Sequence, residues 1–498
     1  MIVAHKDSQN RYHTYIKGGF MTLTTAALQK QTSHINIYDH FAHEDEYPQL
    51  DTEKIADRLA QAIRCKTVYA GEKNTDFSQF DRLQKLMETE FPHVLAASSQ
   101  GLERIGHSVL ITIPGSEPNL SGVMLIAHQD VVPVVAGTKD RWIHGAFDGV
   151  VDDEFIWGRG ALDIKDMLMG ELEAVEFLLA RGFSPRRSIY LAFGEDEEVD
   201  SRGATRIAAC MEKRGIRAEC LLDEGTTTFF DGSAYGAPGT ILSDICISQK
   251  GFLNVRLTVR GCGGHSSNPF GGTSLEHMCT ALSRLAEHPF PPQLNAIVCE
   301  TFRTLAPHIT EEPFTTLVKD LPASGEKLAE AASTVRELYP FVNTTMAVNM
   351  LEGGSSAANV MPGDVQATIN FRMLPGTTAD DVLDHIHKAL GELDVEVEAL
   401  HTTPAGRMDK TDKAGYQELK EVLEHYYPKV EFVPSFVCGG TDSIRYESIC
   451  DSILRISPFR PTPEDEATGV HGINERIAKR VYMQGIRVLI DFIKRMAG

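Results

Sequence analysis

Three histidine- and carboxylate-containing motifs follow apolar or glycine-rich runs in the first half of the chain. His128 and Asp130 follow directly after the apolar residues 123–127. His128 could bind a metal ion, and Asp130 could accept the other ring N–H and fix the tautomer. Asp163 lies in a glycine-containing turn before a predicted helix, where a carboxylate could bridge two cations. Taken alone, a polar loop explains the first motif and a helix N-cap explains the second.

The third motif is a run of four acidic residues, 195–198, after an apolar strand. Adjacent carboxylates repel one another unless cations or protons compensate their charge. We therefore predict that Glu198 binds a metal ion. Glu197 would stay free as a general base that deprotonates a water and passes the proton to the leaving amine. A solvated acidic loop is the alternative.

Two further motifs lie downstream. Asp223 and Glu224 follow the apolar residues 218–222, and either carboxylate could complete a metal site. His471 lies before the last predicted helix and could be a terminal ligand. In a parallel sheet the carboxyl ends of the strands meet at one edge, where binding sites form. The five motifs together therefore predict one site with nitrogen and oxygen ligands, which suit zinc, with cobalt or manganese as alternatives.

The elements that would position these residues alternate between strands and helices. This alternation predicts an α/β fold with a mainly parallel sheet over residues 40–249 and 373–498. Residues 250–372 contain strands with one polar face, together with helices, and predict a smaller inserted α+β domain. Residues 1–39 show no clear periodicity and are expected to form an N-terminal extension, within which Met21 is an alternative start.

The composition argues against two classes of binding partner. The net charge is −21 and the pI about 5.3, so the surface repels nucleic acid and anionic membrane. The nine cysteines include no C-x-x-C pair, which indicates reduced thiols and a cytoplasmic location. No apolar run is long enough for a signal or a membrane span. At 498 residues the chain is expected to form more than one domain.

In order and spacing, the five motifs resemble those of the co-catalytic zinc exopeptidases, a family that includes aminoacylase, glutamate carboxypeptidase and carnosinase-type dipeptidases. The chain looks most similar to the branch of Gly-Xaa carboxypeptidase and the N-fatty-acyl-amino-acid hydrolases. The resemblance covers residues 40–498 and implies two Zn²⁺ per chain. It implies that Asp163 bridges the ions. His128 would bind one ion, Glu198 and His471 the other, and either Asp223 or Glu224 would complete the set.

The same resemblance implies residues for substrate recognition. His265 would stabilise the oxyanion from a neighbouring subunit, so a homodimer through the inserted domain is expected. Arg372 would clamp a substrate carboxylate, with Asn359 lining the same pocket. Gly440 and Thr441 would offer backbone N–H groups to that carboxylate.

These features predict a metal-dependent hydrolase that cleaves an amide bond next to a free carboxylate, in a small peptide or an N-acyl amino acid. One alternative is a non-catalytic relative that binds an amino-acid-like ligand or acts as a scaffold. It would have lost a ligand or the base, and none of these residues is missing. A metal-dependent phosphatase or nuclease would use similar carboxylates. The lack of a basic patch argues against a nucleic-acid substrate.

Overall fold

The computed structural model describes residues 2–6, 12–16, 35–462, 465 and 469–498. The chain divides into two compact units, residues 1–35 and 36–498. The first unit contains the antiparallel pair β1 (Ile2–Lys6) and β2 (Tyr12–Ile16). The second unit contains every predicted site residue and is described below. Among the described residues, no helix is both long and apolar enough to cross a membrane.

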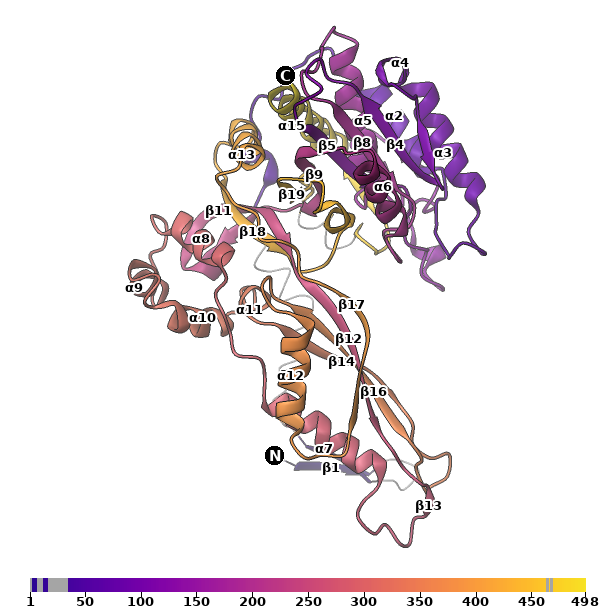
Figure 1. The fold of residues 1–498 in the computed structure, drawn as a ribbon, viewed down its shortest axis with the longest axis vertical. Helices are drawn as coiled ribbons and strands as arrows, with labels where there is room; N and C mark the ends of the chain where they lie inside the picture. The colour runs from indigo at the N-terminus through magenta and orange to yellow at the C-terminus, as the bar shows by residue number, and fades with distance from the viewer. Residues whose placement is uncertain (1, 7–11, 17–34, 463–464, 466–468) are drawn as a thin grey trace. The chain divides into compact units, whose positions relative to one another are not determined.

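A nine-stranded sheet forms the centre of the second unit (Figure 1). Its main path runs β10-β11-β19-β9-β5-β8-β4-β3, and β18 pairs with β11. The four central strands β19, β9, β5 and β8 are mutually parallel. This confirms the predicted α/β class with a mainly parallel sheet. The strand bounds are β3 Glu103–Ile105, β4 Ser108–Ile113, β5 Gly122–His128, β8 Ile189–Gly194, β9 Ala218–Thr226, β10 Phe230–Gly232, β11 Ala237–Gln249, β18 Glu431–Val437 and β19 Ile453–Ile456.

Helices cover both faces of this sheet, which is why β5 and β8 are apolar and buried along their whole length. On one face α5 (Lys165–Leu179) and α15 (Lys479–Ala497) pack against β5. On the other, α6 (Arg202–Lys213) packs on side chains of β4, β5 and β8. The remaining helices are α2 Thr52–Ile63, α3 Phe77–Glu90, α4 Pro92–Ala97 and α13 Ala414–Tyr426, with 3-10 turns η1 Ile37–His40, η2 Lys139–Arg141, η3 Ser233–Tyr235 and η4 Asp442–Tyr446. A three-stranded sheet joins β6 Val150–Val151, β7 Phe155–Trp157 and β20 Arg476–Ala478.

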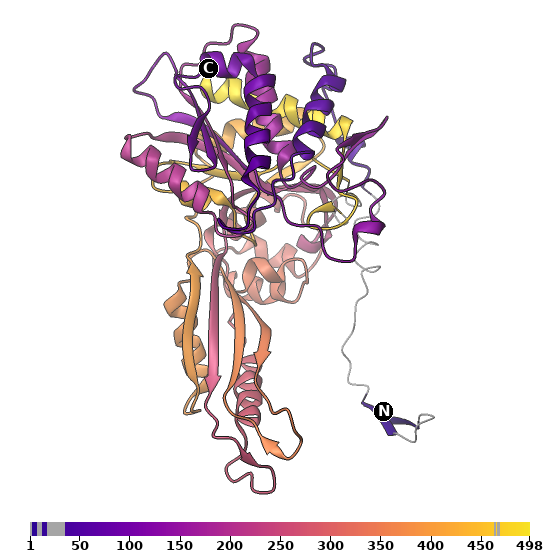
Figure 2. The same ribbon diagram turned by 90° about the vertical axis from the view of Figure 1, so that its right-hand side faces the viewer.

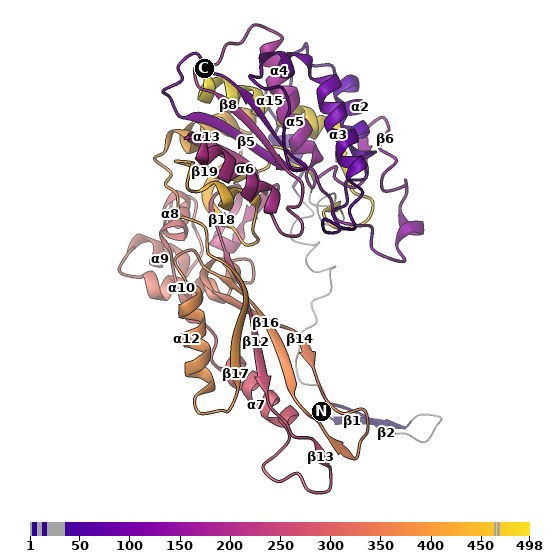
Figure 3. The same cartoon turned by 45° about the vertical axis from the view of Figure 1, so that its right-hand side comes forward.

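A second, four-stranded antiparallel sheet has the order β14-β16-β12-β17 (Figures 2 and 3). Its strands are β12 Gly251–Val259, β14 Thr345–Glu352, β16 Val365–Met373 and β17 Glu396–Thr403. Burial alternates along β12 and β16, because one face packs under α7 (Ser274–Glu287) and α12 (Ala379–Leu390). The predicted limits of the inserted segment, 250–372, stay a prediction. The small sheet itself continues to Thr403.

A helical segment interrupts the small sheet in sequence. It contains α8 Ala296–Leu305, α9 Phe314–Lys319, α10 Gly325–Ser333 and α11 Tyr339–Val342. Thr301 of α8 donates a hydrogen bond of 2.6 Å to the Pro434 carbonyl of β18, so α8 packs on the large sheet. In Figure 1 the helices α8, α9 and α10 accordingly lie beside β11 and β18.

The two sheets are joined where β11 runs almost directly into β12, with only Lys250 between the strands. The connection after β17 crosses at the same place. There the Gly406 N–H donates to the Gln249 carbonyl at 3.0 Å, and the Ser248 hydroxyl donates to the Gly406 carbonyl at 2.8 Å. A Cβ atom at Gly251 would lie 2.7 Å from the Ala405 nitrogen, so glycine permits this close approach. We call residues 248–251 and 404–406 the crossing.

Candidate metal centre

Two groups of potential metal ligands share one carboxylate. The first group is His128, Asp163 and Glu224, and the second is Asp163, Glu198 and His471. Within each group the donor atoms lie within 4.8 Å of one another. Asp163 presents its Oδ1 atom 3.3 Å from His128 Nε2 and its Oδ2 atom 2.9 Å from His471 Nε2. One carboxylate therefore faces both groups, which is the geometry of a ligand that bridges two cations.

The parallel strands bring these residues together. His128 is the last residue of β5, Glu198 follows β8, and Glu224 lies near the end of β9. Because β8, β5 and β9 are adjacent and parallel, their carboxyl ends lie at one edge of the sheet. Asp163 comes from the turn before α5, and His471 from the loop before β20.

The His128 ring indicates that a cation fits here. Its Nδ1 atom lies 3.0 Å from the Asp130 carbonyl and 3.3 Å from an Asp130 carboxylate oxygen, two acceptors that would hold the proton on Nδ1 when a cation binds Nε2. The buried Nε2 atom has no hydrogen-bond partner among the described residues. It faces the oxygens of Asp163 at 3.3 Å and Glu224 at 3.8 Å. A lone pair that faces carboxylates in this way suits a shared cation.

Asp130 also holds the acidic loop, a role that sequence reasoning missed. Its two carboxylate oxygens accept the backbone N–H groups of Glu197 at 3.1 Å and Glu198 at 3.2 Å. The fully buried Asp130 therefore links His128 to both acidic residues.

Burial, followed by the nearby Glu224 charge, raises the pKa of Glu197 well above its usual range. Burial likewise raises the pKa of Glu224. Hydrogen bonds to Asp163 and Glu198 raise the pKa of His471 to about 10. The site therefore concentrates negative charge, and cations or protons must compensate it.

The structure distinguishes the two carboxylates of the fourth motif. Glu224 belongs to the first donor group. Asp223 points elsewhere: its Oδ2 atom accepts the Ser443 N–H at 3.1 Å, and its Oδ1 atom accepts the Glu224 N–H at 2.8 Å. Asp223 therefore lies behind the ligand, where it connects β9 to η4.

Glu475 is a second residue whose role the sequence did not reveal, although it closes the fifth motif. Its buried carboxylate accepts the N–H groups of Gly160, Leu162 and Asp163 at 2.8–3.2 Å. Its other oxygen pairs with Arg159 at 2.6 Å. Since Glu475 is four residues from His471, it joins the turn that carries Asp163 to the loop that carries His471.

A cavity of about 630 Å³ opens beside the donor groups, between the two sheets. The structure brings Arg372, Gly440 and Thr441 into its wall together with Glu197. Arg372 is half-buried and lies over the Phe252 ring at 4.9 Å. Side chains that sequence reasoning did not single out also line the cavity: Gln249, Lys250, Phe252, His401 and Thr403. They come from the crossing and the small sheet, so only the assembled fold identifies them.

His265 and Asn359 lie elsewhere. His265 is in the short strand β13 (Gly264–His265), which pairs with β15 (Val360–Met361). The Ser266 N–H donates to the Asn359 carbonyl at 3.0 Å, so the two predicted residues are neighbours. Both follow the end of the small sheet that is remote from the crossing (Figures 1 and 3). Asn359 precedes β15, which pairs with β13 at that remote end, and it is not among the residues that line the Arg372 cavity.

A shared aspartate between two histidine–carboxylate groups, with a free glutamate beside them, defines a metal-dependent hydrolase. The chain belongs to peptidase family M20/M25/M40, whose sequence model matches residues 124–495. It is 31% identical to a probable carboxypeptidase S-like 2 of Dictyostelium discoideum, over 90% of this chain and 86% of that protein. It is 32% identical to the N-fatty-acyl-amino acid synthase/hydrolase PM20D1 of Mus musculus, over 88% of this chain and 87% of that one.

Solved structures show the same fold. The M20 metallo-carboxypeptidase Sso-CP2 of Sulfolobus solfataricus matches with a TM-score of 0.64 at 19% identity, over 89% of this chain and 99% of that chain. Human carnosine dipeptidase 1 matches with a TM-score of 0.57 at 15% identity, over 91% of this chain and 98% of that chain. The predicted family and its hydrolytic class are therefore confirmed, and the catalytic interpretation is favoured over a binding or scaffold protein.

Proposed function

We propose that this protein is a two-zinc hydrolase that cleaves the amide bond next to a free carboxylate, in a small peptide or an N-acyl amino acid. The position of Asp163 carries the proposal, because its two oxygens face separate donor groups. His128 and Glu224 would complete one zinc site, and Glu198 and His471 the other. Nitrogen and oxygen donors of this kind suit zinc, and cobalt or manganese would fit the same set.

Metal ions bound by these donors would supply Lewis-acid polarisation of the scissile carbonyl and of a water molecule. Glu197 lies in the cavity wall and outside both donor groups, so its carboxylate is free to take a proton from the attacking water. It then delivers that proton to the leaving nitrogen. Asp130 holds the Glu197 backbone in place during both transfers.

Substrate orientation would come from other residues of the cavity wall. The Arg372 guanidinium has the forked geometry that binds a carboxylate through two hydrogen bonds. Gly440 could offer its backbone N–H in the same cavity, whereas the Thr441 N–H donates to Gln249 Oε1 at 3.3 Å. The relatives named above include a carboxypeptidase and a hydrolase of N-fatty-acyl amino acids. We propose that the substrate of this chain is either a small peptide or an N-acyl amino acid. Both kinds of molecule carry a free carboxylate.

The test is a matched substrate panel assayed with added zinc. N-acyl amino acids and dipeptides are compared with the same compounds whose terminal carboxylate is converted to an amide. We expect turnover only when the carboxylate is present and zinc is bound. Equal turnover of the amidated compounds would refute the role of Arg372, and turnover that persists after complete metal removal would refute the metal mechanism.

We also propose that the active form is a homodimer through the small sheet. His265 follows the remote end of β12, about 30 Å of extended chain away from the crossing. A second chain could bring its His265 to the cavity. The edge strand β14 is suited to such pairing, because its side chains Val348, Met350 and Leu351 are each about half exposed.

Mixing two inactive variants tests this arrangement. His265→Ala removes the donated histidine and Glu197→Gln removes the base. A mixed dimer would hold one complete site, so random exchange of subunits should restore roughly a quarter of the wild-type activity. An active monomer, or a mixture that stays inactive after exchange, would contradict the proposal.

We further propose a cytoplasmic location. All nine cysteines are free thiols, as expected for a protein of a reducing compartment.

A further inference from the structure

A second cluster of metal-binding side chains lies outside the active site. His43 and Glu46 belong to the segment 36–50 that precedes α2, and His425 lies near the end of α13. The Glu46 Oε1 atom lies 3.2 Å from His43 Nδ1 and 2.9 Å from His425 Nε2. All three donor atoms lie within 4.8 Å of one another. None of these residues takes part in the chemistry proposed above.

The donor set has the chemistry of a transition-metal site. Two imidazole nitrogens and one carboxylate oxygen suit Zn²⁺, Ni²⁺ and Cu²⁺. Metal–ligand distances of about 2.0–2.1 Å place tetrahedral ligand atoms roughly 3.3 Å apart. The two contacts of Glu46 are already close to that separation. The rings of His43 and His425 stack with centroids 3.8 Å apart and planes 17° from parallel, so one ring must rotate before both lone pairs point at one ion.

Neighbouring groups orient the carboxylate. The second oxygen of Glu46 lies 3.0 Å from the Tyr426 hydroxyl, which also contacts Asp491 at 2.6 Å. The backbone is held as well, because Arg487 Nε donates to the Glu46 carbonyl at 3.0 Å. Outer partners of this kind fix metal-binding carboxylates and raise metal affinity. In addition, His43 adopts a φ of +55°, which is uncommon for a residue with a side chain.

We propose that His43, Glu46 and His425 form a third metal site, independent of the active site, for one divalent transition-metal ion with Zn²⁺-like ligand preference. Its occupation would fasten the segment 36–50 to α13. The three side chains are partly exposed, which leaves a fourth coordination position to water.

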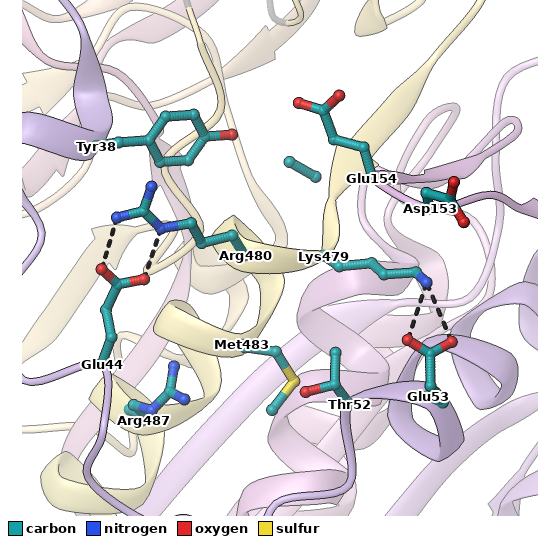
Figure 4. Close-up of a pocket in the computed structure, with 11 residues that line it drawn as sticks. Tyr38, Glu44, Thr52, Glu53, Asp153, Glu154, Lys479, Arg480, Met483 and Arg487 are labelled. Atoms are coloured by element: carbon teal, nitrogen blue, oxygen red, sulfur yellow. Dashed lines mark hydrogen bonds and ion pairs between the residues drawn. The ribbon is translucent and has the colours of Figure 1, made fainter.

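The segment already has weaker attachments that a metal ion would reinforce. The Ala42 N–H donates to the Tyr426 carbonyl at 2.9 Å, and Gln484 donates to the Ala42 carbonyl at 2.7 Å. Glu44 forms a two-contact ion pair with Arg480 of α15 at 2.6 Å (Figure 4). That pair lies in the wall of a shallow cavity of about 530 Å³, where Lys479 pairs likewise with Glu53. A metal ion would add a bond to α13 next to these contacts to α15.

The test uses the zinc-loaded enzyme and Ni²⁺ as the probe. Calorimetric titration, with zinc content measured in parallel, should show one additional equivalent of Ni²⁺ and a rise in Tm. His43→Ala and His425→Ala should each weaken this binding at least ~10-fold and abolish the rise in Tm. Turnover should stay at the wild-type level, because neither residue lies in the active site.

Two comparisons make the result specific. His385→Ala is the matched control. It removes a histidine that stacks on the Phe290 ring but belongs to no group of potential metal ligands among the described residues. Ni²⁺ binding and the rise in Tm should therefore stay as in the wild type. Glu46→Gln keeps the shape of the third ligand and removes its charge, so it should weaken binding even if a histidine variant folds poorly. Cu²⁺ should give an electron paramagnetic resonance spectrum with coupling to two nitrogens.

No additional equivalent of Ni²⁺ up to ~1 mM would overturn the proposal. So would binding that survives both histidine substitutions. Since every measurement is made with the active-site zinc in place and compares only added metal, failure of this proposal is distinct from failure of the proposed hydrolytic function.

Discussion

Replacement of Glu197 by glutamine separates proton transfer from metal binding. Glutamine has the same size but cannot accept a proton from water at neutral pH. Because the Glu197 backbone N–H is held by Asp130 at 3.1 Å, the substitution should leave the acidic loop in place. Glu197 belongs to neither donor group, so both metal ions should remain bound.

The expected loss follows from the role of the carboxylate. General acid–base catalysis contributes roughly 10²–10⁴-fold to the rate. Glu197 would act twice, on the water and on the leaving nitrogen, so we expect kcat to fall by at least ~10³-fold, or about 4 kcal/mol of transition-state stabilisation. KM should change little, because the substitution leaves the proposed substrate contacts of Arg372 and Gly440 unaltered.

The assay combines steady-state kinetics with metal content per chain. Glu198→Gln is the matched control, because it alters the adjacent carboxylate, which belongs to the second donor group. This control should lose metal and regain part of its activity in excess zinc, whereas Glu197→Gln should not respond. If Glu197→Gln keeps more than a tenth of wild-type kcat with full metal content, Glu197 is not the base.

Three further results are expected. Arg372→Lys should lower kcat/KM by ~10²-fold on carboxylate substrates, because an ammonium group cannot form the two-bond clamp. Glu475→Gln should lower the free energy of unfolding by about 3–5 kcal/mol, measured in urea, because it removes the charge that pairs with buried Arg159. Glu475→Asp, which keeps the negative charge, should retain part of the free energy of unfolding that Glu475→Gln loses. Removal of divalent metal with a chelator should lower Tm and abolish turnover, since the clustered carboxylates then repel one another, and zinc should restore both.

The large sheet and the clustering of the candidate metal ligands could be predicted from sequence, because three of these residues follow the apolar runs that form the strands. The apolar runs before His128, Glu198 and Glu224 mark buried parallel strands, and buried parallel strands end at one edge. The helical periodicity of residues 379–390 matches α12, Ala379–Leu390. The apolar spacing over residues 51–86 is also helical, but the chain forms two helices there, α2 and α3, with Gly71 and its φ of +82° in the connection between them.

Contacts between residues far apart in the chain could not be predicted, because they leave no local pattern in the sequence. The choice between Asp223 and Glu224 depends on Ser443, which lies 220 residues away. Glu475 and the Asp163 turn are likewise joined only in the folded chain. Asn359 was assigned to the Arg372 pocket because the two are near in sequence, yet β15 pairs with β13 and takes it to the other end of the small sheet. The presence of His401 in the cavity wall depends on the register in which β17 pairs with β12. Sequence periodicity alone does not determine that register.

The crossing has a mechanical consequence. Arg372 pairs in register with Phe252, one residue beyond Gly251, whereas β13 follows the far end of β12. Arg372 therefore lies close to the crossing, whereas the tip of the small sheet lies about 30 Å from it. A rotation of roughly 10° about the crossing would shift the guanidinium by less than about 1 Å but swing the tip through about 5 Å. Small adjustments around a bound carboxylate would thus be amplified at the far tip.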